Sequence, residues 1–213
     1  LKQKVDLSLV IVHAGREHVP SPPPYIQSAY RQMVRAGADI VVAHHPHVPQ
    51  GIEIYQGVPI IYSMGNFVFW QEEDNPYQHK GFFVELEFVG SRLGELRVVP
   101  YGIYPEGLAL LKGAEREQFF EELEMLSRLL YDPEKTQELW AAFADLYYEL
   151  RPEKELVLDY STPLAAARSK NYFITPAHRE LMITMLNRIH YGQIGTSEGW
   201  AQELVRKWMG WDQ

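Results

Sequence analysis

Apolar runs in the first third of the chain flank one amphipathic segment, which is the pattern of a strand–helix–strand unit. Residues 5–12 are almost uninterrupted in apolar character and predict a buried strand. Residues 26–34 then place apolar side chains at helical spacing, and Gly37 follows where a left-handed helix cap is wanted. Residues 40–43 form a second apolar run. Strand, helix, strand over this length predicts two parallel strands.

The next part of the chain has the alternation of antiparallel strands. Residues 51–55 and 58–62 flank Gln56-Gly57, which predicts a tight hairpin. Apolar and charged side chains alternate over 84–88, and the apolar positions of 96–98 continue the pattern after a glycine-bounded turn. We expect a second antiparallel pair, or an extension of the first sheet, with one face in water. The predicted fold class is therefore α/β, in the mixed α+β sense.

From about residue 114 the apolar spacing becomes helical. Asp132-Pro133 and Thr175-Pro176 are helix-start signals, and four apolar stripes follow helical periodicity up to the end of the chain. We predict an α/β domain at residues 1–113 and a helical subdomain at 114–213. The tryptophan-rich stripes of the subdomain can either pack on each other or dock a partner, and the sequence leaves both open.

Composition excludes several classes of protein. The chain has 213 residues, 46% of them apolar, and a formal charge of −8, which disfavours nucleic acid as a partner. It contains no cysteine, so neither disulfides nor thiolate metal sites are available. No apolar run approaches the roughly 18 residues that span a bilayer. Because the chain starts at Leu1, close before a core strand, we expect it to be a piece of a longer product.

Histidines follow both predicted parallel strands. His13 ends the first strand, and His45 and His47 come directly after the second. Parallel strands direct their carboxyl ends to one edge of a sheet, so these imidazoles should meet there. In extended backbone, His45 and His47 would point the same way while His44 faces elsewhere. Glu17 adds a carboxylate nearby, and the group predicts a metal site.

The predicted hairpin returns the chain beside the histidines. Its far end, Ser63 to Asn66, should lie close to the histidine loop, so Asn66 is a candidate site residue. The aromatic residues Phe67, Phe69 and Trp70 that follow are expected in the core.

Four motifs in this order resemble the capsule-synthesis CapA family, also called poly-γ-glutamate synthesis proteins. They are His13-Ala14-Gly15-Arg16-Glu17, Ala36-Gly37-Ala38-Asp39-Ile40-Val41, His45-Pro46-His47-Val48 and Tyr62-Ser63-Met64-Gly65-Asn66-Phe67-Val68-Phe69. The resemblance covers roughly residues 1–105. That family is similar to the calcineurin-like metallophosphoesterases, so the resemblance implies the C-terminal portion of such a sandwich, followed here by the helical region.

The resemblance also implies roles for residues. His13, His45 and His47 would be metal ligands for one or two divalent ions (Mn, Fe, Zn or Mg). Asn66 would orient a ligand or an oxyanion, and Glu17 would be a ligand, the support of a ligand or a base. The family's Gly-Asp, Asn-Leu-Glu and Asn-Asn-His stretches are missing from this chain. The remaining ligands are therefore expected from a missing N-terminal segment or another chain.

Two functions are compatible with this resemblance. The first is a metal-dependent hydrolase of capsule or poly-γ-glutamate biosynthesis, which cuts a phosphoester or an amide of an acidic polymer once the site is complete. The alternative is a non-catalytic accessory or scaffold protein of an envelope polymer synthesis and export complex. Membrane subunits of a polymer synthase are then expected partners, nucleic acid is not, and the expected location is the cell envelope or extracellular face.

Overall fold

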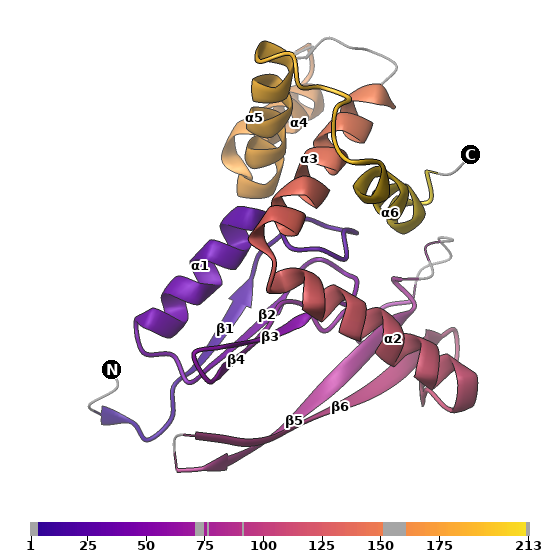
Figure 1. Ribbon diagram of the computed structural model, residues 1–213. Helices are drawn as coiled ribbons and strands as arrows, with labels where there is room; N and C mark the ends of the chain where they lie inside the picture. The colour runs from indigo at the N-terminus through magenta and orange to yellow at the C-terminus, as the bar shows by residue number, and fades with distance from the viewer. Residues whose placement is uncertain (1–3, 71–74, 76, 91, 151–160, 212–213) are drawn as a thin grey trace. The chain divides into compact units, whose positions relative to one another are not determined.

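The computed structural model describes residues 4–70, 75, 77–90, 92–150 and 161–211. In this part the chain is a mixed α/β protein with two sheets and six helices (Figure 1), which confirms the predicted class. It divides into two compact units, Leu1–Thr136 and Gln137–Gln213. The change to helices begins with α2 (Gly113–Leu130), and this helix belongs to the first unit.

The first sheet contains the strand–helix–strand unit and the hairpin. Its strands are β1 (Leu9–His13), β2 (Ile40–His44), β3 (Ile52–Tyr55) and β4 (Val58–Ile61), in the spatial order β1-β2-β4-β3. Helix α1 (Pro24–Arg35) connects β1 to β2, and these strands are parallel, as predicted. The predicted hairpin is β3–β4, which turns through Gln56 and Gly57 at φ 54° and 79°. Positive φ at both central residues is the requirement of a type I′ turn.

The second sheet is antiparallel throughout. It consists of β5 (Lys80–Val89), β6 (Arg92–Tyr104) and β7 (Gly107–Leu110), in that order. Strand β5 alternates between half-buried and exposed residues over its second half, as expected for a strand with one face in water. The predicted second pair of strands is therefore confirmed, as a separate sheet.

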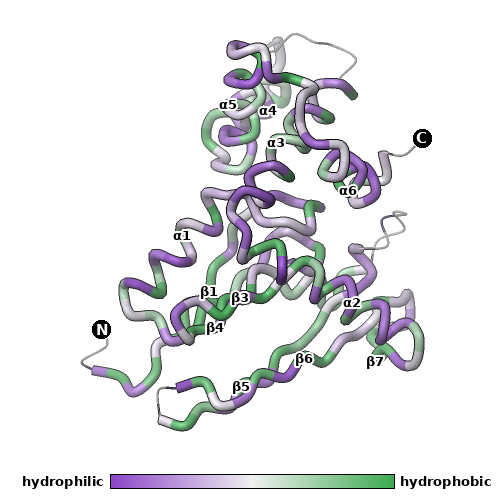
Figure 2. Tube along the Cα trace, viewed as in Figure 1, coloured by the Kyte–Doolittle hydropathy of each residue, from purple (hydrophilic) through white to green (hydrophobic). Residues whose placement is uncertain are grey.

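Strand β2 lies between two apolar cores because its successive side chains point to opposite faces. Val41 and Ala43 pack with α1 in one core, and Ile40 packs with Phe82 of β5 and Phe119 of α2 in the other. Helix α1 therefore covers one face of the first sheet, while the second sheet and α2 cover the other. Figure 2 shows hydrophobic colour along the strands of both sheets, as this arrangement requires.

A buried charged network ties α1 to the hairpin. Arg31 donates to both carboxylate oxygens of Glu53, the shorter bond being 2.6 Å, and the Tyr62 hydroxyl donates to the same carboxylate at 2.8 Å. Arg31 also donates to the carbonyl of Leu130, at the end of α2, at 2.8 Å. Glu53 is 1% exposed, so its charge is stabilised by these partners rather than by water.

The prediction of a buried first strand is wrong. Strand β1 starts only at Leu9, and its side chains alternate, with Leu9 52% and Ile11 70% exposed. β1 is an edge strand, and Val10 and Val12 on its other face pack with α1. Among the described residues, no strand pairs with the outer edge of β1, and nothing covers its face with Leu9 and Ile11. Proteins normally cover such an edge.

The second unit is helical. It contains most of α3 (Pro133–Glu149), then α4 (Pro163–Ile174), α5 (Pro176–His190) and α6 (Gly199–Met209). The carboxylate of Asp132 accepts from the backbone N–H groups of Glu134 and Lys135, so the predicted start of α3 is confirmed. The apolar pattern did not predict α4, which has no buried residue.

Two of the C-terminal tryptophans, Trp208 and Trp211, pack within this unit, as the packing alternative expects. Trp200 is 39% exposed, so the docking of a partner stays a prediction. Trp208 is 1% exposed, and the Trp211 ring stacks on Phe143 of α3 at 5.8 Å. A buried ion pair also joins α3 to α5: Arg188 donates to both oxygens of Asp145, each at 2.7 Å.

Candidate metal centre

Two loops meet at the carboxyl ends of β1 and β2. The backbone N–H of Ala14 donates to the His44 carbonyl at 3.1 Å, and that of His18 donates to the Pro46 carbonyl at 2.8 Å. Gly15 has φ +132°, and a Cβ placed there would lie 3.2 Å from the Pro46 ring. Glycine thus permits a close approach of the two loops.

The histidine loop has an unusual backbone. His18, His45 and His47 have φ of 65°, 107° and 62°, which are backbone angles that residues other than glycine rarely adopt. The expectation of extended backbone at His45 and His47 is therefore wrong. Their side chains are nevertheless brought together, because the loop is held by its bonds to the neighbouring loop.

Glu17, His45 and His47 form a group that can hold a metal ion. Each offers one ligand atom, and these atoms all lie within 4.8 Å of one another. His45 Nε2 is 3.9 Å from the Glu17 carboxylate, and both side chains are partly exposed. Two imidazole nitrogens and one carboxylate oxygen fit zinc, manganese or iron better than magnesium, which prefers oxygen ligands.

His13 approaches the same group from the other side of His45. Its Nε2 lies 3.2 Å from His45 Nδ1, and the two rings stand 4.9 Å apart at 61°. Two ligands of a tetrahedral zinc-like ion are separated by about 3.4 Å, given bonds of about 2.1 Å. The His13–His45 spacing therefore suits either a shared ion or a hydrogen bond. Because the two nitrogens of one imidazole diverge, a single ion can use His45 together with Glu17 or together with His13, but not with both.

The pKa shifts of His44 and His45 favour their neutral forms. Burial lowers the pKa of His45; the Glu17 carboxylate opposes this effect, and the neighbouring His13 and His47 lower the pKa further. Burial and His13 also lower the pKa of His44. Neutral imidazole is the form that binds a metal ion.

Asn66 fixes the tautomer of His47. The Asn66 amide oxygen lies 2.8 Å from His47 Nδ1, and the amide nitrogen donates to the Gln78 carbonyl at 3.1 Å. A backbone carbonyl only accepts, so the amide nitrogen must face Gln78 and the amide oxygen must face His47. His47 Nδ1 therefore carries the proton, and its Nε2 keeps a free lone pair for a ligand.

The second sheet holds Asn66 in place. The Tyr101 hydroxyl donates to the Asn66 carbonyl at 2.7 Å, and Gly65 forms an isolated bridge to Gly81. A Cβ at Gly81 would lie 2.5 Å from the Asn66 carbonyl oxygen. Glycine at this position allows β5 to approach the asparagine, which is 6% exposed.

Sequence reasoning did not find Gln78. This residue is 3% exposed, its amide contacts Nδ1 of His18, and its carbonyl positions Asn66. His18 in turn stacks on His47 at 5.9 Å. Gln78 sits in a polar loop that has no periodic pattern, so the sequence contains no signal for its burial.

The aromatic segment after Asn66 is at the surface. Phe67, Phe69 and Trp70 are 54%, 46% and 40% exposed, so the expectation that they lie in the core is wrong. The Phe69 ring lies 5.7 Å from that of His47, next to the candidate ligands.

The described helices include none with the length and apolar character needed to cross a bilayer.

Residues 1–71 match the family described as "Bacterial capsule synthesis protein PGA_cap". Over 70 residues the chain is 47% identical to "Capsule biosynthesis protein CapA" of Bacillus anthracis, a match that covers 33% of this chain and 17% of that protein. It is also 47% identical over 70 residues to "PGA biosynthesis protein CapA" of Bacillus subtilis (strain 168), covering 33% and 18%.

A third relative is more distant. The chain is 31% identical over 88 residues to a "Probable polyglutamine synthesis accessory protein" of Mycobacterium tuberculosis (strain CDC 1551 / Oshkosh), covering 41% of this chain and 23% of that protein. The chain thus spans only a small part of the curated relatives it matches. The matching segment contains every predicted site residue, namely His13, Glu17, His45, His47 and Asn66. Residues 1–71 of this chain are therefore similar to the bacterial capsule synthesis protein PGA_cap family.

Proposed function

We propose that this chain provides part of a divalent-metal centre in a protein of capsule or poly-γ-glutamate biosynthesis. The observation that carries the proposal is the convergence of Glu17, His45 and His47, whose ligand atoms lie within 4.8 Å of one another. This group lies inside the segment that is 47% identical to the Bacillus proteins named for capsule and PGA biosynthesis. Site and family segment therefore coincide.

The chemistry best suited to this donor set is hydrolysis. A divalent ion held here would supply Lewis acidity and a water of lowered pKa, which suits cleavage of a phosphoester or of an amide in an acidic polymer. The chain's own residues bind and orient. His45 and His47 offer imidazole nitrogens, Asn66 keeps the proton of His47 on Nδ1, and Glu17 offers an oxygen as ligand or as proton acceptor.

A two-metal site needs further ligands, in particular a bridging carboxylate. We propose that these come from the longer protein or from another chain. The open edge and face of β1 support this proposal, since a further strand placed parallel to β1 would end beside His13. We also propose that the protein is associated with the cell envelope, which the capsule and PGA biosynthesis names of the relatives support. Polymer synthase membrane subunits as partners are part of the same proposal.

The alternative is an accessory role without turnover. It is favoured by the printed name of the Mycobacterium relative, an accessory protein of polyglutamine synthesis. In that case a metal ion would hold the two loops together and cut nothing. Metal binding is common to both functions, so only turnover separates them.

The test measures metal binding and turnover in variants of the complete protein, loaded with manganese or zinc. It compares Glu17, which lies near His45 Nε2, with His13, which lies near His45 Nδ1. We expect Glu17→Gln to weaken metal binding more than His13→Ala, because Glu17 belongs to the mutually close ligand group. We expect phosphodiester or polymer-amide turnover that is lost in His45→Ala and kept in His190→Ala, a substitution far along the chain on α5. Metal binding without turnover of either bond would support the accessory role, and absence of metal binding would refute both.

A further inference from the structure

The α4–α5 hairpin of the second unit has apolar side chains on its outer surface. Helix α4 has no buried residue, and among its exposed residues Leu164 is 62% and Ile174 is 60% exposed. On α5, Ile183 is 45% and Leu186 is 49% exposed, and Tyr191 directly after the helix is 69% exposed. Where such exposed apolar side chains form one contiguous surface, that surface is a candidate interaction site.

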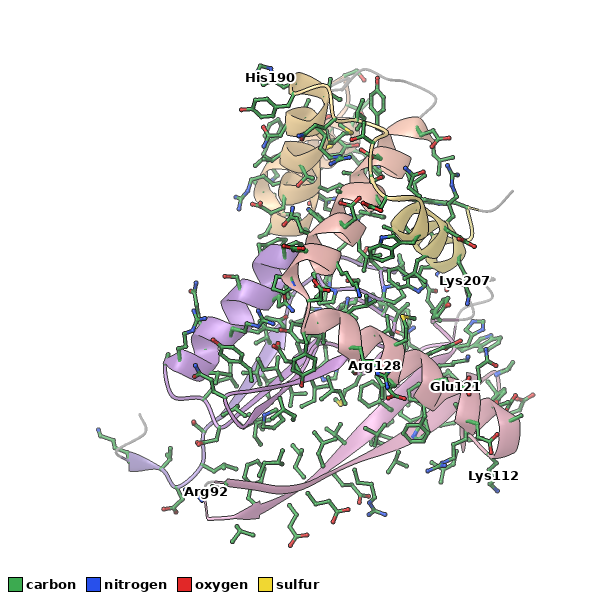
Figure 3. The ribbon with its side chains drawn as sticks, in the orientation of Figure 1. Arg92, Lys112, Glu121, Arg128, His190 and Lys207 are labelled. Atoms are coloured by element: carbon green, nitrogen blue, oxygen red, sulfur yellow. The ribbon has the colours of Figure 1, made fainter. Side chains whose placement is uncertain are left out.

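On α5 these residues follow a helical stripe. Arg179, Ile183, Leu186 and His190 are all exposed and occur at positions i, i+4, i+7 and i+11, which share one face of a helix. The opposite face is buried and contains Leu181 and Met185. The exposed face therefore has two large aliphatic side chains between Arg179 and His190, and Figure 3 shows His190 at the end of the helix.

The charge of this hairpin is opposite to that of the chain. Residues 161–190 contain four Lys or Arg and one Asp or Glu, whereas the whole chain has a formal charge of −8. Arg188 is engaged with buried Asp145. Arg168 and Lys170 are exposed on α4, and among the described residues neither forms an ion pair. With four basic side chains and one acidic side chain, residues 161–190 therefore have a formal net charge of +3.

We propose that the α4–α5 hairpin docks peripherally on an anionic lipid surface. Exposed aliphatic side chains on a hairpin of net positive charge suit the boundary between acyl chains and acidic headgroups, and a tyrosine at the helix end suits the same depth. A second copy of the chain fits less well, because a two-fold interface through this hairpin would bring two surfaces of net positive charge together.

The test is co-sedimentation of the 213-residue chain with vesicles. We expect binding to vesicles that contain phosphatidylglycerol, no binding to pure phosphatidylcholine, and weaker binding at higher salt. Ile183→Asp should abolish binding. Arg168→Glu with Lys170→Glu should weaken it by more than roughly fivefold per side chain, since each basic residue contributes about that factor and reversal also adds repulsion.

Matched controls are Val89→Asp, at the 70% exposed tip of β5, and Lys207→Glu on α6, and both should bind like the parent chain. Circular dichroism of each variant shows whether the helices are intact. The proposal is overturned if the parent chain does not bind anionic vesicles or if the hairpin variants bind them as well as the controls do. Sedimentation equilibrium that shows self-association abolished by Ile183→Asp would identify a second copy as the occupant instead.

Discussion

Asn66 shows how one buried amide determines what a neighbouring imidazole can do. Its amide nitrogen is committed to the Gln78 carbonyl, so its oxygen faces His47 Nδ1. The His47 tautomer follows from this contact and not from the sequence near His47. Sequence reasoning found Asn66 as a candidate because the hairpin returns beside the histidines, but it could not find the acceptor that orients the amide.

Replacing Asn66 by leucine should weaken metal binding by about 10–100-fold, the usual effect of losing the group that orients a ligating histidine. Without the amide oxygen, His47 can place its proton on Nε2 and lose its lone pair there. Competition with a chromophoric chelator measures the affinity. Asn187→Leu, on the exposed face of α5, is the control. Equal affinities for the two variants would show that Asn66 has no part in the site.

At the scale of the elements, the approach of β5 to the Ser63–Asn66 turn depends on glycine. At Gly81 a Cβ would lie 2.5 Å from both the Asn66 carbonyl oxygen and the Tyr101 hydroxyl. Such an atom must displace the turn, the tyrosine or the strand. The position of Asn66 is thus a property of the packing between the two sheets.

We predict that Gly81→Ala lowers the free energy of unfolding by about 1–3 kcal/mol, the range for added methyl groups in packed sites. It should also weaken metal binding, because Asn66 moves with the turn. Gly199→Ala is the matched change, since a Cβ there meets nothing within 4 Å. Urea titration and the chelator assay measure the two effects. If the Gly81→Ala variant were measurably less stable but bound metal with unchanged affinity, the position of the Ser63–Asn66 turn would not affect the metal site.

The elements that the sequence predicted are those with a clear period. The parallel pair β1–β2, the hairpin β3–β4 and the pair β5–β6 were predictable because each has apolar residues on a definite face. Helix α4 was not, although Thr162-Pro163 has the same start signal as Thr175-Pro176, and Thr162 does cap the helix by accepting from Ala165 N–H at 3.1 Å. Helix α4 has no buried residue, so its apolar side chains do not mark a core-facing side.

Other features depended on tertiary structure. The exposure of Leu9 and Ile11 follows from the edge position of β1, which an apolar run cannot reveal. The positive φ of His45 and His47 follows from the contact between two loops distant in sequence. The histidine cluster was still predictable, since the parallel strands alone bring the loops to one sheet edge.

At the scale of the whole molecule, the two compact units are stabilised by different interactions. The first has two sheets and the buried Arg31–Glu53 pair, and the second depends on helix packing and the Asp145–Arg188 pair. Burial raises the pKa of Asp145, but hydrogen bonds from Arg188 and Ser197 outweigh burial and hold that pKa below its ordinary value. The stability from this group is present above the unfolded-state pKa and is lost as the pH falls through the folded-state pKa.

We therefore predict that the second unit loses stability on acidification below about pH 4, the unfolded-state value for aspartate. Asp145→Asn should cost about 3–5 kcal/mol at neutral pH, because it leaves Arg188 half-buried without its charge partner, and should flatten the acid dependence. Four of the five tryptophans lie after residue 136, so tryptophan fluorescence in urea mainly follows this unit. Glu149→Gln, in the exposed pair with Arg206, should cost less than about 1 kcal/mol. Equal losses in the two variants would contradict this assignment.

The most direct test of the central claim is the metal stoichiometry of the 213-residue chain, measured by elemental analysis after loading with zinc or manganese and dialysis. The claim is that Glu17, His45 and His47 form one site. We predict one ion per chain for the parent and for His190→Ala, and none for His45→Ala or His47→Ala. Metal that is retained in His45→Ala, or absent from the folded parent chain, would contradict the account.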